Sequence, residues 1–225
     1  MIPDNKLNRT LEKIKKSCEC EGKGCSTCLS KIGRVQRYAK AGVPIDYWLL
    51  AFKDFQGDKN FKNFIKEKLK DIHSTYDEGR SMAFVGNLGV GKTFAACSIL
   101  KLAIINDYTA QYTTMSYIIN NILSNDVSTA SYLKQLNELD FLVIDEFDER
   151  YVFPSEKTEI LFGSNLEYIL RTRFQNKLPT ILCSNTEDID TVLSSEFSNA
   201  FKSLRSRYMD LVYVSGKDFR KEGNR

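Results

Sequence analysis

The sequence feature that most constrains the fold is the segment 81–100, SMAFVGNLGVGKTFAACSIL. Its apolar residues 82–85 predict a short buried strand, and the apolar spacing after Thr93 is typical of a helix. Between them, residues 86–93 match the pattern G-x-x-x-x-G-K-[ST] at every fixed position. A glycine-rich turn lets the backbone approach phosphate oxygens, and the N-terminus of the following helix attracts them. The segment therefore predicts a phosphate-binding loop, and a chance glycine-rich turn is the alternative.

The predicted loop assigns a role to each of its side chains. Lys92 would bring a positive charge to the β- and γ-phosphates of a nucleoside triphosphate, and the Thr93 hydroxyl would bind Mg²⁺. The backbone of the loop would surround the phosphates. The predicted nucleotide-binding residues are Gly86, Asn87, Leu88, Gly89, Val90, Gly91, Lys92 and Thr93.

Two further predicted strands end in polar residues. Residues 141–144 are apolar and precede Asp145 and Glu146, and a further buried strand, expected over 179–184, precedes Asn185. Ligands of parallel sheets bind at the carboxyl ends of the strands. There Asp145 would hold Mg²⁺, Glu146 would act as general base on the attacking water, and Asn185 would bond that water or the γ-phosphate. Acids also commonly start helices, and an asparagine can be a polar turn residue, but the upstream loop favours the catalytic interpretation.

Four of the six cysteines lie close together near the N-terminus in the pattern C-x-C-x4-C-x2-C. They are Cys18, Cys20, Cys25 and Cys28. This spacing can close a tetrahedral all-thiolate site, for which Zn²⁺ is the expected ion, and four thiolates leave no open position for a substrate. A structural zinc site is therefore predicted, with a redox pair or unligated thiols as alternatives. Cys97 and Cys183 lie in apolar surroundings and are expected in the core.

The first forty residues carry ten Lys or Arg and four acids, whereas the formal net charge of the whole chain is +3. A basic metal-binding module can bind nucleic acid, it can bind an acidic protein surface, or its charges can face solvent. No aromatic residue occurs before Tyr38, so a surface that stacks on bases is not indicated. The charge pattern leaves these interpretations open.

No apolar run is long enough to cross a bilayer, and residues 1–20 lack the apolar core of a signal peptide. We therefore expect a cytoplasmic protein without a membrane partner, whose thiols stay reduced.

The expected fold class is α/β, with a three-layer arrangement around a central parallel sheet. A boundary is expected at Gly42-Val43-Pro44, because proline disfavours a helical residue before it. Residues 1–43 would form a helix and the zinc module, and residues 44–225 the α/β domain. The aromatic segment 46–58, which contains Trp48, is either core or part of an adenine pocket. Further helices are expected over 5–16, 30–41, 59–78, 115–139 with a break near 125–128, 155–176 and 196–208, and further strands over 109–114 and 211–214.

From about residue 37 to residue 220, the chain resembles the AAA+ ATPase domain of bacterial and phage replicative helicase loaders of the DnaC/DnaI type, and the transposition helper IstB is similar. The motifs that carry this resemblance are A-G-V-P at 41–44 before F-K-D-F at 52–55, the loop 86–93, L-V-I-D-E at 142–146, the strand 180–185, Ser206-Arg207 and G-K-D-F-R at 216–220.

The resemblance implies a P-loop AAA+ fold whose helical lid is absent or minimal. It implies an ATPase, using ATP and Mg²⁺, that loads a replicative hexameric helicase onto single-stranded DNA in the cytoplasm of a bacterium or of a phage-infected cell. The N-terminal module would dock on the helicase, and the protein would self-associate through ATP-bridged interfaces. Asn185 would be sensor 1 and Arg207 would reach the neighbour's nucleotide, with Arg205 as the rival.

Two other functions stay open at this stage. One is an IstB-like helper ATPase that assembles on duplex DNA. The other is a nucleotide-held scaffold with negligible hydrolysis, against which the intact Glu146 argues.

Overall fold

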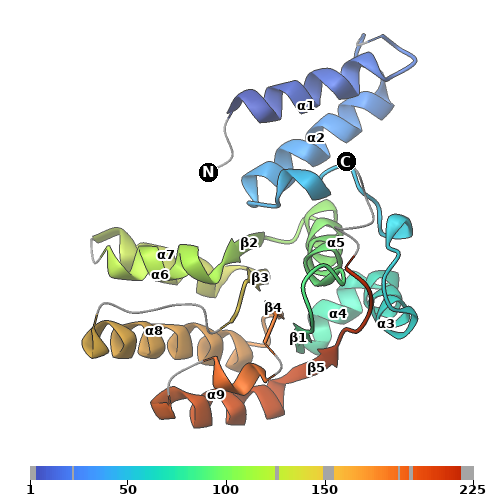
Figure 1. The fold of residues 1–225 in the computed structure, drawn as a ribbon. Helices are drawn as coiled ribbons and strands as arrows, with labels where there is room; N and C mark the ends of the chain where they lie inside the picture. Colours follow the sequence, from blue (N-terminus) through green and yellow to red (C-terminus); the bar gives the residue numbers. More distant parts are fainter. Residues whose placement is uncertain are drawn as a thin grey trace. The chain divides into compact units, whose positions relative to one another are not determined.

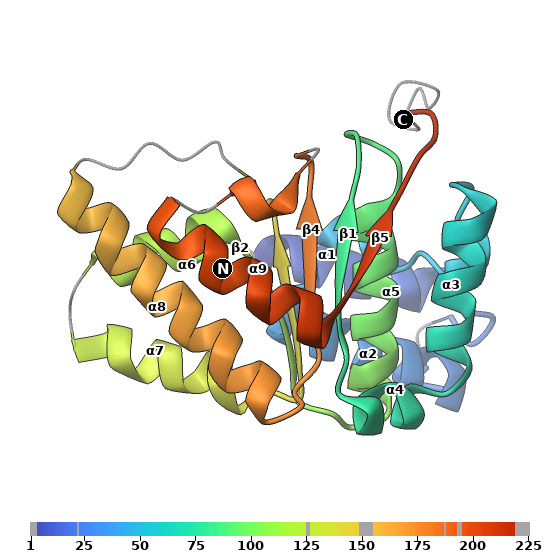
Figure 2. The ribbon, with the colours of Figure 1, turned by 90° about the horizontal axis from the view of Figure 1, so that it is seen from below.

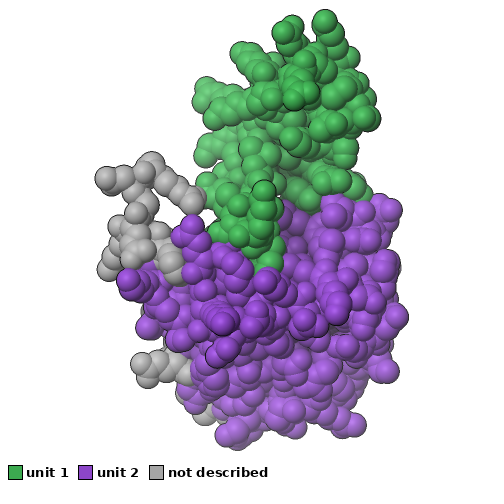
Figure 3. All heavy atoms as spheres, turned by 90° about the vertical axis from the view of Figure 1, so that its right-hand side faces the viewer, with its two compact units in different colours: residues 1–54 green, residues 55–225 purple. Residues whose placement is uncertain are grey.

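The computed structural model forms two compact units, residues 1–54 and residues 55–225 (Figure 3). We call them the N-terminal unit and the C-terminal unit. The boundary predicted after residue 43 stays a prediction. The residues that the structure describes are 4–21, 23–124, 127–148, 155–186, 188–192 and 195–218.

The N-terminal unit is built on two helices, α1 (Asp4–Lys16) and α2 (Ser26–Lys40), which pack against each other. Ile14 of α1 and Val35 of α2 are among the buried apolar side chains of the unit. The helix predicted over 30–41 begins earlier than expected, at Ser26, so Cys28 lies in its first turn.

Two short 3-10 helices follow, η1 (Ile45–Tyr47) and η2 (Phe52–Asp54). Next to η1, the Trp48 side chain is 3% exposed. Its Nε1 donates a hydrogen bond to the Val43 carbonyl at 2.7 Å. A buried indole that has satisfied its only donor within its own unit supports the core interpretation of this aromatic segment.

The C-terminal unit contains a parallel sheet with the strand order β2-β3-β4-β1-β5 (Figures 1 and 2). Its strands are β1 (Ser81–Val85), β2 (Ala110–Thr114), β3 (Phe141–Asp145), β4 (Thr180–Ser184) and β5 (Met209–Tyr213). All residues of β1, β3 and β4 are buried. Such continuous burial is typical of central parallel strands that are covered on both faces. The predicted α/β class with a central parallel sheet is confirmed.

Helices cover both faces of this sheet. They are α3 (Lys59–Lys70), α4 (Ile72–Glu78), α5 (Lys92–Ile105), α6 (Met115–Leu123), α7 (Val127–Glu138), α8 (Glu156–Gln175) and α9 (Ser195–Tyr208), with the 3-10 helix η3 (Ile189–Thr191) before α9. The strand side chains alternate between the two faces. Ala83 and Val85 join the core that α6 to α9 share, whereas Phe84 packs on Phe61 of α3 with 5.0 Å between ring centroids.

The prediction of one helix over 59–78 is wrong in one respect, because the structure has two helices there, α3 and α4. Asp71 separates them with an extended backbone (φ −142°, ψ 98°). Its carboxylate accepts hydrogen bonds from the backbone N–H groups of His73 and Ser74 at 3.0 and 3.1 Å. An aspartate in this position is a strong N-cap, so it starts α4 rather than continuing α3. The predicted break within 115–139 is confirmed by α6 and α7.

No helix among the described residues has the length and the apolar character that crossing a membrane requires.

A buried arginine connects the segments at the amino-terminal edge of the sheet, where β3 and β4 begin. Arg173 of α8 is 0% exposed. Its guanidinium donates to the carbonyl oxygens of Leu136, Leu139 and Pro179 at 2.6, 2.8 and 3.0 Å, and to Thr180 Oγ1 at 2.8 Å. Burial lowers the pKa of Arg173 to about 9, so the side chain is still charged at neutral pH. One side chain therefore ties the end of α7 to the start of β4.

We expect Arg173→Met to lower the free energy of unfolding by about 3 kcal/mol, because it leaves buried carbonyl oxygens without a donor. Urea denaturation measures this loss. Arg171→Met is the matched control, since Arg171 lies on the same helix, is about half exposed and pairs with Glu167 on the surface. Its removal should change the stability by no more than about 0.5 kcal/mol. Equal losses in the two variants would contradict the assigned role of Arg173.

Candidate functional site

The loop between β1 and α5 has the backbone conformation that its glycines predict. Gly86 and Gly91 have φ values of +154° and +102°. A Cβ atom on Gly86 would lie 2.1 Å from the Val214 carbonyl oxygen, and one on Gly91 would lie 2.5 Å from the Phe55 ring. Side chains at these two positions would clash with their neighbours, so glycine is required there.

Lys92 crosses this loop from the first position of α5. Its Nζ donates to the carbonyl oxygens of Gly86 and Asn87, both at 2.7 Å, and the residue is 6% exposed. The ammonium group therefore lies at the loop, where the N-terminus of α5 adds a positive partial charge. Both features favour an anion, as the sequence predicts.

Thr93 and Asp145, the two predicted magnesium ligands, are in direct contact. Thr93 Oγ1 donates to Asp145 Oδ2 at 2.8 Å, although β4 separates β1 from β3 in the sheet. Asp145 is 8% exposed, and its Oδ1 accepts the Glu146 backbone N–H at 2.8 Å. A hydroxyl and a carboxylate held together in this way are oxygen ligands of the kind that Mg²⁺ prefers. The chemistry of these donors fits the ion.

Tyr112 belongs to this group as well, and the sequence analysis missed it. Its hydroxyl, on β2, donates to Asp145 Oδ2 at 2.7 Å. Burial, and then the neighbouring Asp145 carboxylate, raise the pKa of Tyr112 far above its ordinary value, so the phenol stays a donor. The contact depends on the register in which Thr114 lies beside Asp145, and no motif signals it.

Glu146 follows β3 in a left-handed conformation, with φ +56°. This conformation is uncommon for a residue with a side chain. It leaves Glu146 exposed while Phe147 returns to the core, where its backbone N–H bonds the Cys183 carbonyl at 2.9 Å. The carboxylate of Glu146 can therefore reach solvent water at the carboxyl edge of the sheet, as a general base requires.

Asn185 directly follows β4 at the same edge of the sheet. Its Nδ2 donates to Asp148 Oδ2 at 3.1 Å, and Asp148 is 5% exposed. The structure thus brings Lys92, Thr93, Asp145, Glu146 and Asn185 to the carboxyl ends of neighbouring strands, while the roles assigned to them stay predictions. Asp148 is a further residue that the sequence analysis missed, because its contact with Asn185 depends on the turn at Glu146.

The two candidate arginines differ in their surroundings. Arg205 forms two hydrogen bonds to the Asp190 carboxylate at 2.6 and 2.7 Å, with side-chain exposures of 15% and 14%. The hydrogen bonds with Asp190 raise the pKa of Arg205. Arg207 is exposed, and its guanidinium lies 5.3 Å from the centroid of the Tyr208 ring. Arg205 is therefore engaged within its own chain, whereas Arg207 can extend from the surface.

The C-terminal motif at 216–220 is described only in part. Asp218 lies against the loop, since its Oδ1 is only 1.8 Å from the position of a Cβ on Gly89. Phe219 and Arg220 of the same motif lie outside the described residues.

The four N-terminal cysteines converge in the N-terminal unit. Their sulfur atoms lie within 4.8 Å of one another, with Cys18 and Cys25 at 3.4 Å and Cys20 and Cys28 at 3.5 Å. Four thiolates around a tetrahedral zinc ion have sulfurs about 3.8 Å apart, given Zn–S bonds of about 2.3 Å. A hydrogen bond from the Cys25 backbone lowers the pKa of Cys20 to about 6, whereas burial raises the pKa of Cys28 to about 11, so the distances between the sulfur atoms carry the argument for a site. This geometry fits one metal ion.

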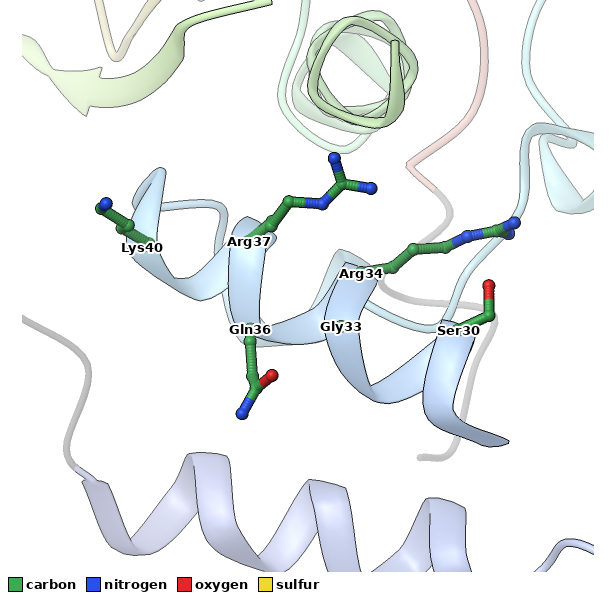
Figure 4. A pocket seen from close by; sticks show the side chains of 6 residues that line it. All are labelled: Ser30, Gly33, Arg34, Gln36, Arg37 and Lys40. Carbon is green, nitrogen blue, oxygen red and sulfur yellow. The ribbon is translucent and has the colours of Figure 1, made fainter. Parts of the chain in front are cut away.

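Helix α2 also presents cations along one stretch of its surface. Arg34, Arg37 and Lys40 are exposed at intervals of three residues (Figure 4). With Ser30, Gly33 and Gln36 they line an open hollow of about 510 Å³. Such a row suits phosphate groups and carboxylates alike.

Comparison with known proteins finds relatives by structure only. No protein-family model matches the chain, and no curated protein matches it. The chain is similar to the crystal structure of the DnaC helicase loader, with a TM-score of 0.63 and 19% identity over 76% of this chain and 100% of that one. For DnaI the values are 0.60, 17%, 76% and 94%.

A third similar structure is the replication initiator DnaA bound to AMPPCP and single-stranded DNA. Its TM-score is 0.57, with 18% identity over 78% of this chain and 51% of that one. The chain thus spans about half the length of that DnaA structure. At these identities the likeness concerns the fold, and it confirms that the chain has the AAA+ fold found in helicase loaders of the DnaC/DnaI type.

We expect the purified chain to carry one zinc ion, because its four thiolates fit a closed tetrahedral site. Elemental analysis after gel filtration measures the ratio of zinc to protein. Cys28→Ser should lose the metal. Cys97→Ser is the matched control: burial raises the pKa of the Cys97 thiol well above its ordinary value, so it is an inert core residue and should leave the zinc content unchanged. Protein that binds no zinc, or the same amount in both variants, would contradict the metal site.

Proposed function

We propose that this chain is an ATPase that loads a replicative hexameric helicase onto single-stranded DNA during replication initiation. The observation that carries the ATPase part is the bond between Thr93 Oγ1 and Asp145 Oδ2 beside Lys92, which joins a phosphate loop to an acid two strands away. The loader part is supported by the shared fold with the DnaC helicase loader and with DnaI.

In the proposed reaction, the phosphates of ATP lie against the loop 86–91, and Lys92 exchanges its carbonyl partners for phosphate oxygens. Thr93 and Asp145 would hold Mg²⁺, which supplies neutralising charge on the phosphates when bound. Glu146 accepts a proton from the attacking water, and Asn185 orients that water or the γ-phosphate. The similar DnaA structure with AMPPCP supports an adenine nucleotide as the ligand.

We assign the remaining positive charge to a neighbouring subunit. Arg205 is held by Asp190 of its own subunit, whereas Arg207 is exposed near the end of α9. An arginine supplied in trans stabilises the charge of the transferring phosphoryl group and makes hydrolysis depend on assembly. Self-association through ATP-bridged interfaces follows from this role.

We expect Arg207→Ala and Lys92→Ala each to abolish ATP turnover, and an equal mixture of the two to recover part of it. In the mixture, a subunit with an intact Lys92 receives Arg207 from its neighbour, so the two defects complement each other. A phosphate-release assay measures the turnover, and Glu146→Gln serves as the control that binds ATP without hydrolysing it.

Two results would contradict this assignment. A mixture without any turnover would place Arg207 in the same subunit as the loop that it serves. Unchanged turnover in Glu146→Gln would support the nucleotide-held scaffold instead, because the general base would then be dispensable.

The N-terminal unit is the proposed docking element. Its cysteine cluster would fix the turn between α1 and α2, and the cations of α2 would face an acidic surface of the helicase. Single-stranded DNA is part of the proposal because the similar DnaA structure is bound to it. The alternative, a transposition helper that assembles on duplex DNA, would direct the same cations to phosphates. Either function belongs in the cytoplasm of a bacterium or of a phage-infected cell.

We expect the full-length protein with ATP to retain a purified replicative helicase hexamer from its own source on gel filtration. The variant Arg34→Glu/Arg37→Glu should lose the hexamer, because it reverses the charge of the α2 surface. Lys134→Glu is the control, since Lys134 is an exposed cation of α7 that lies outside that surface. Salt-sensitive binding to duplex DNA without retention of the helicase would favour the transposition helper.

A further inference from the structure

The turn after β3 places the buried carboxylate of Asp148 in contact with Asn185. Glu146 takes a left-handed conformation, and the Asp148 backbone N–H bonds the Glu146 carbonyl at 3.0 Å, which closes a tight turn. Phe147 is buried within that turn and packs on Phe201, with 5.5 Å between the ring centroids. These contacts fix Asp148, which is itself 5% exposed.

Asp148 then contacts the first residue beyond β4. The bond from Asn185 Nδ2 to Asp148 Oδ2 measures 3.1 Å, and it joins the ends of two neighbouring strands. An ionised carboxylate only accepts hydrogen bonds, whereas a carboxamide has one donating and one accepting end. The NH₂ group of Asn185 must therefore face Asp148. The partner thus decides which way the carboxamide is turned and which of its groups are left for a ligand.

We propose that Asp148 is a positioning residue that sets the orientation of the Asn185 carboxamide toward the γ-phosphate and the attacking water. This inference rests on the proposed ATPase function, in which Asn185 contacts those groups. Asp148 itself touches neither in this assignment and acts through Asn185. An amide that is free to turn over would present its donor and its acceptor in either order, and only one order suits the transition state.

The first test separates positioning from binding. Asp148→Asn keeps the shape of the side chain but adds a donor, so the Asn185 carboxamide is no longer held in one orientation. We expect turnover at saturating ATP to fall by about ten-fold, while the dissociation constant for a fluorescent ATP analogue stays within about two-fold of that of the wild type. Asp188→Asn is the matched control, because Asp188 lies beyond β4 and accepts the Asp190 backbone N–H, which an asparagine can also accept.

The second test asks whether Asp148 acts through Asn185. In an Asn185→Ala background, Asp148→Asn should have no further effect on turnover, because the group that it positions is gone. Losses that multiply in the double variant would overturn the inference and assign the effect of Asp148 to the neighbouring Glu146. A wild-type protein without ATP turnover would refute the proposed function, and the inference with it, so the two failures are distinguishable.

The contact between Asp148 and Asn185 can also be tested without nucleotide. This measurement still applies to variants that have lost activity for another reason. In ¹⁵N-labelled protein, the side-chain NH₂ signals of Asn185 are identified by their absence in Asn185→Ala. We expect Asp148→Asn to shift these signals, and Asp188→Asn to leave them in place. If Asp148→Asn leaves them unmoved, the bond does not form in solution and the inference is overturned.

Discussion

The turn from β1 into α5 is the constraint on which the rest of the candidate site depends. Because the backbone must reverse without side chains at Gly86 and Gly91, the first turn of α5 begins at the carboxyl edge of the sheet. Thr93 can then reach Asp145 across β4, and Lys92 can reach back to the loop carbonyls. A wider turn would move both side chains away from the strands that complete the site.

The strand order explains why residues distant in sequence meet there. β4 lies between β1 and β3, so Asn185 emerges between the phosphate loop and the acids after β3. Parallel strands place all their carboxyl ends at one edge, and crossover helices occupy the faces. The site is therefore assembled from strand ends. The buried Arg173 stabilises the opposite end of the same sheet, because it bonds the Leu139 carbonyl before β3 and the Pro179 carbonyl before β4.

The sequence predicts the parts of this site that are local and misses those that depend on register or on turns. The loop and the pair Asp145-Glu146 are read from adjacent residues, and the structure places them together. Tyr112 reaches Asp145 only because β2 lies beside β3 in one register, and Asp148 reaches Asn185 only because Glu146 adopts a left-handed turn. No periodicity encodes either contact. In the same way, α3 and α4 separate because of one capping side chain.

The two candidate arginines differ in their surroundings, and the sequence motif does not encode this difference. Arg205 and Arg207 stand two residues apart at the end of α9, and the sequence alone leaves Arg205 as a rival of Arg207 for the role toward a neighbour's nucleotide. Asp190 lies on η3, an element with no motif of its own, and its carboxylate pairs with Arg205 of the same chain. The transition state of phosphoryl transfer needs positive charge beyond Lys92. An arginine already paired with a carboxylate would have to break that pair to supply it, so the exposed Arg207 fits the proposed role toward an adjoining copy better than Arg205 does.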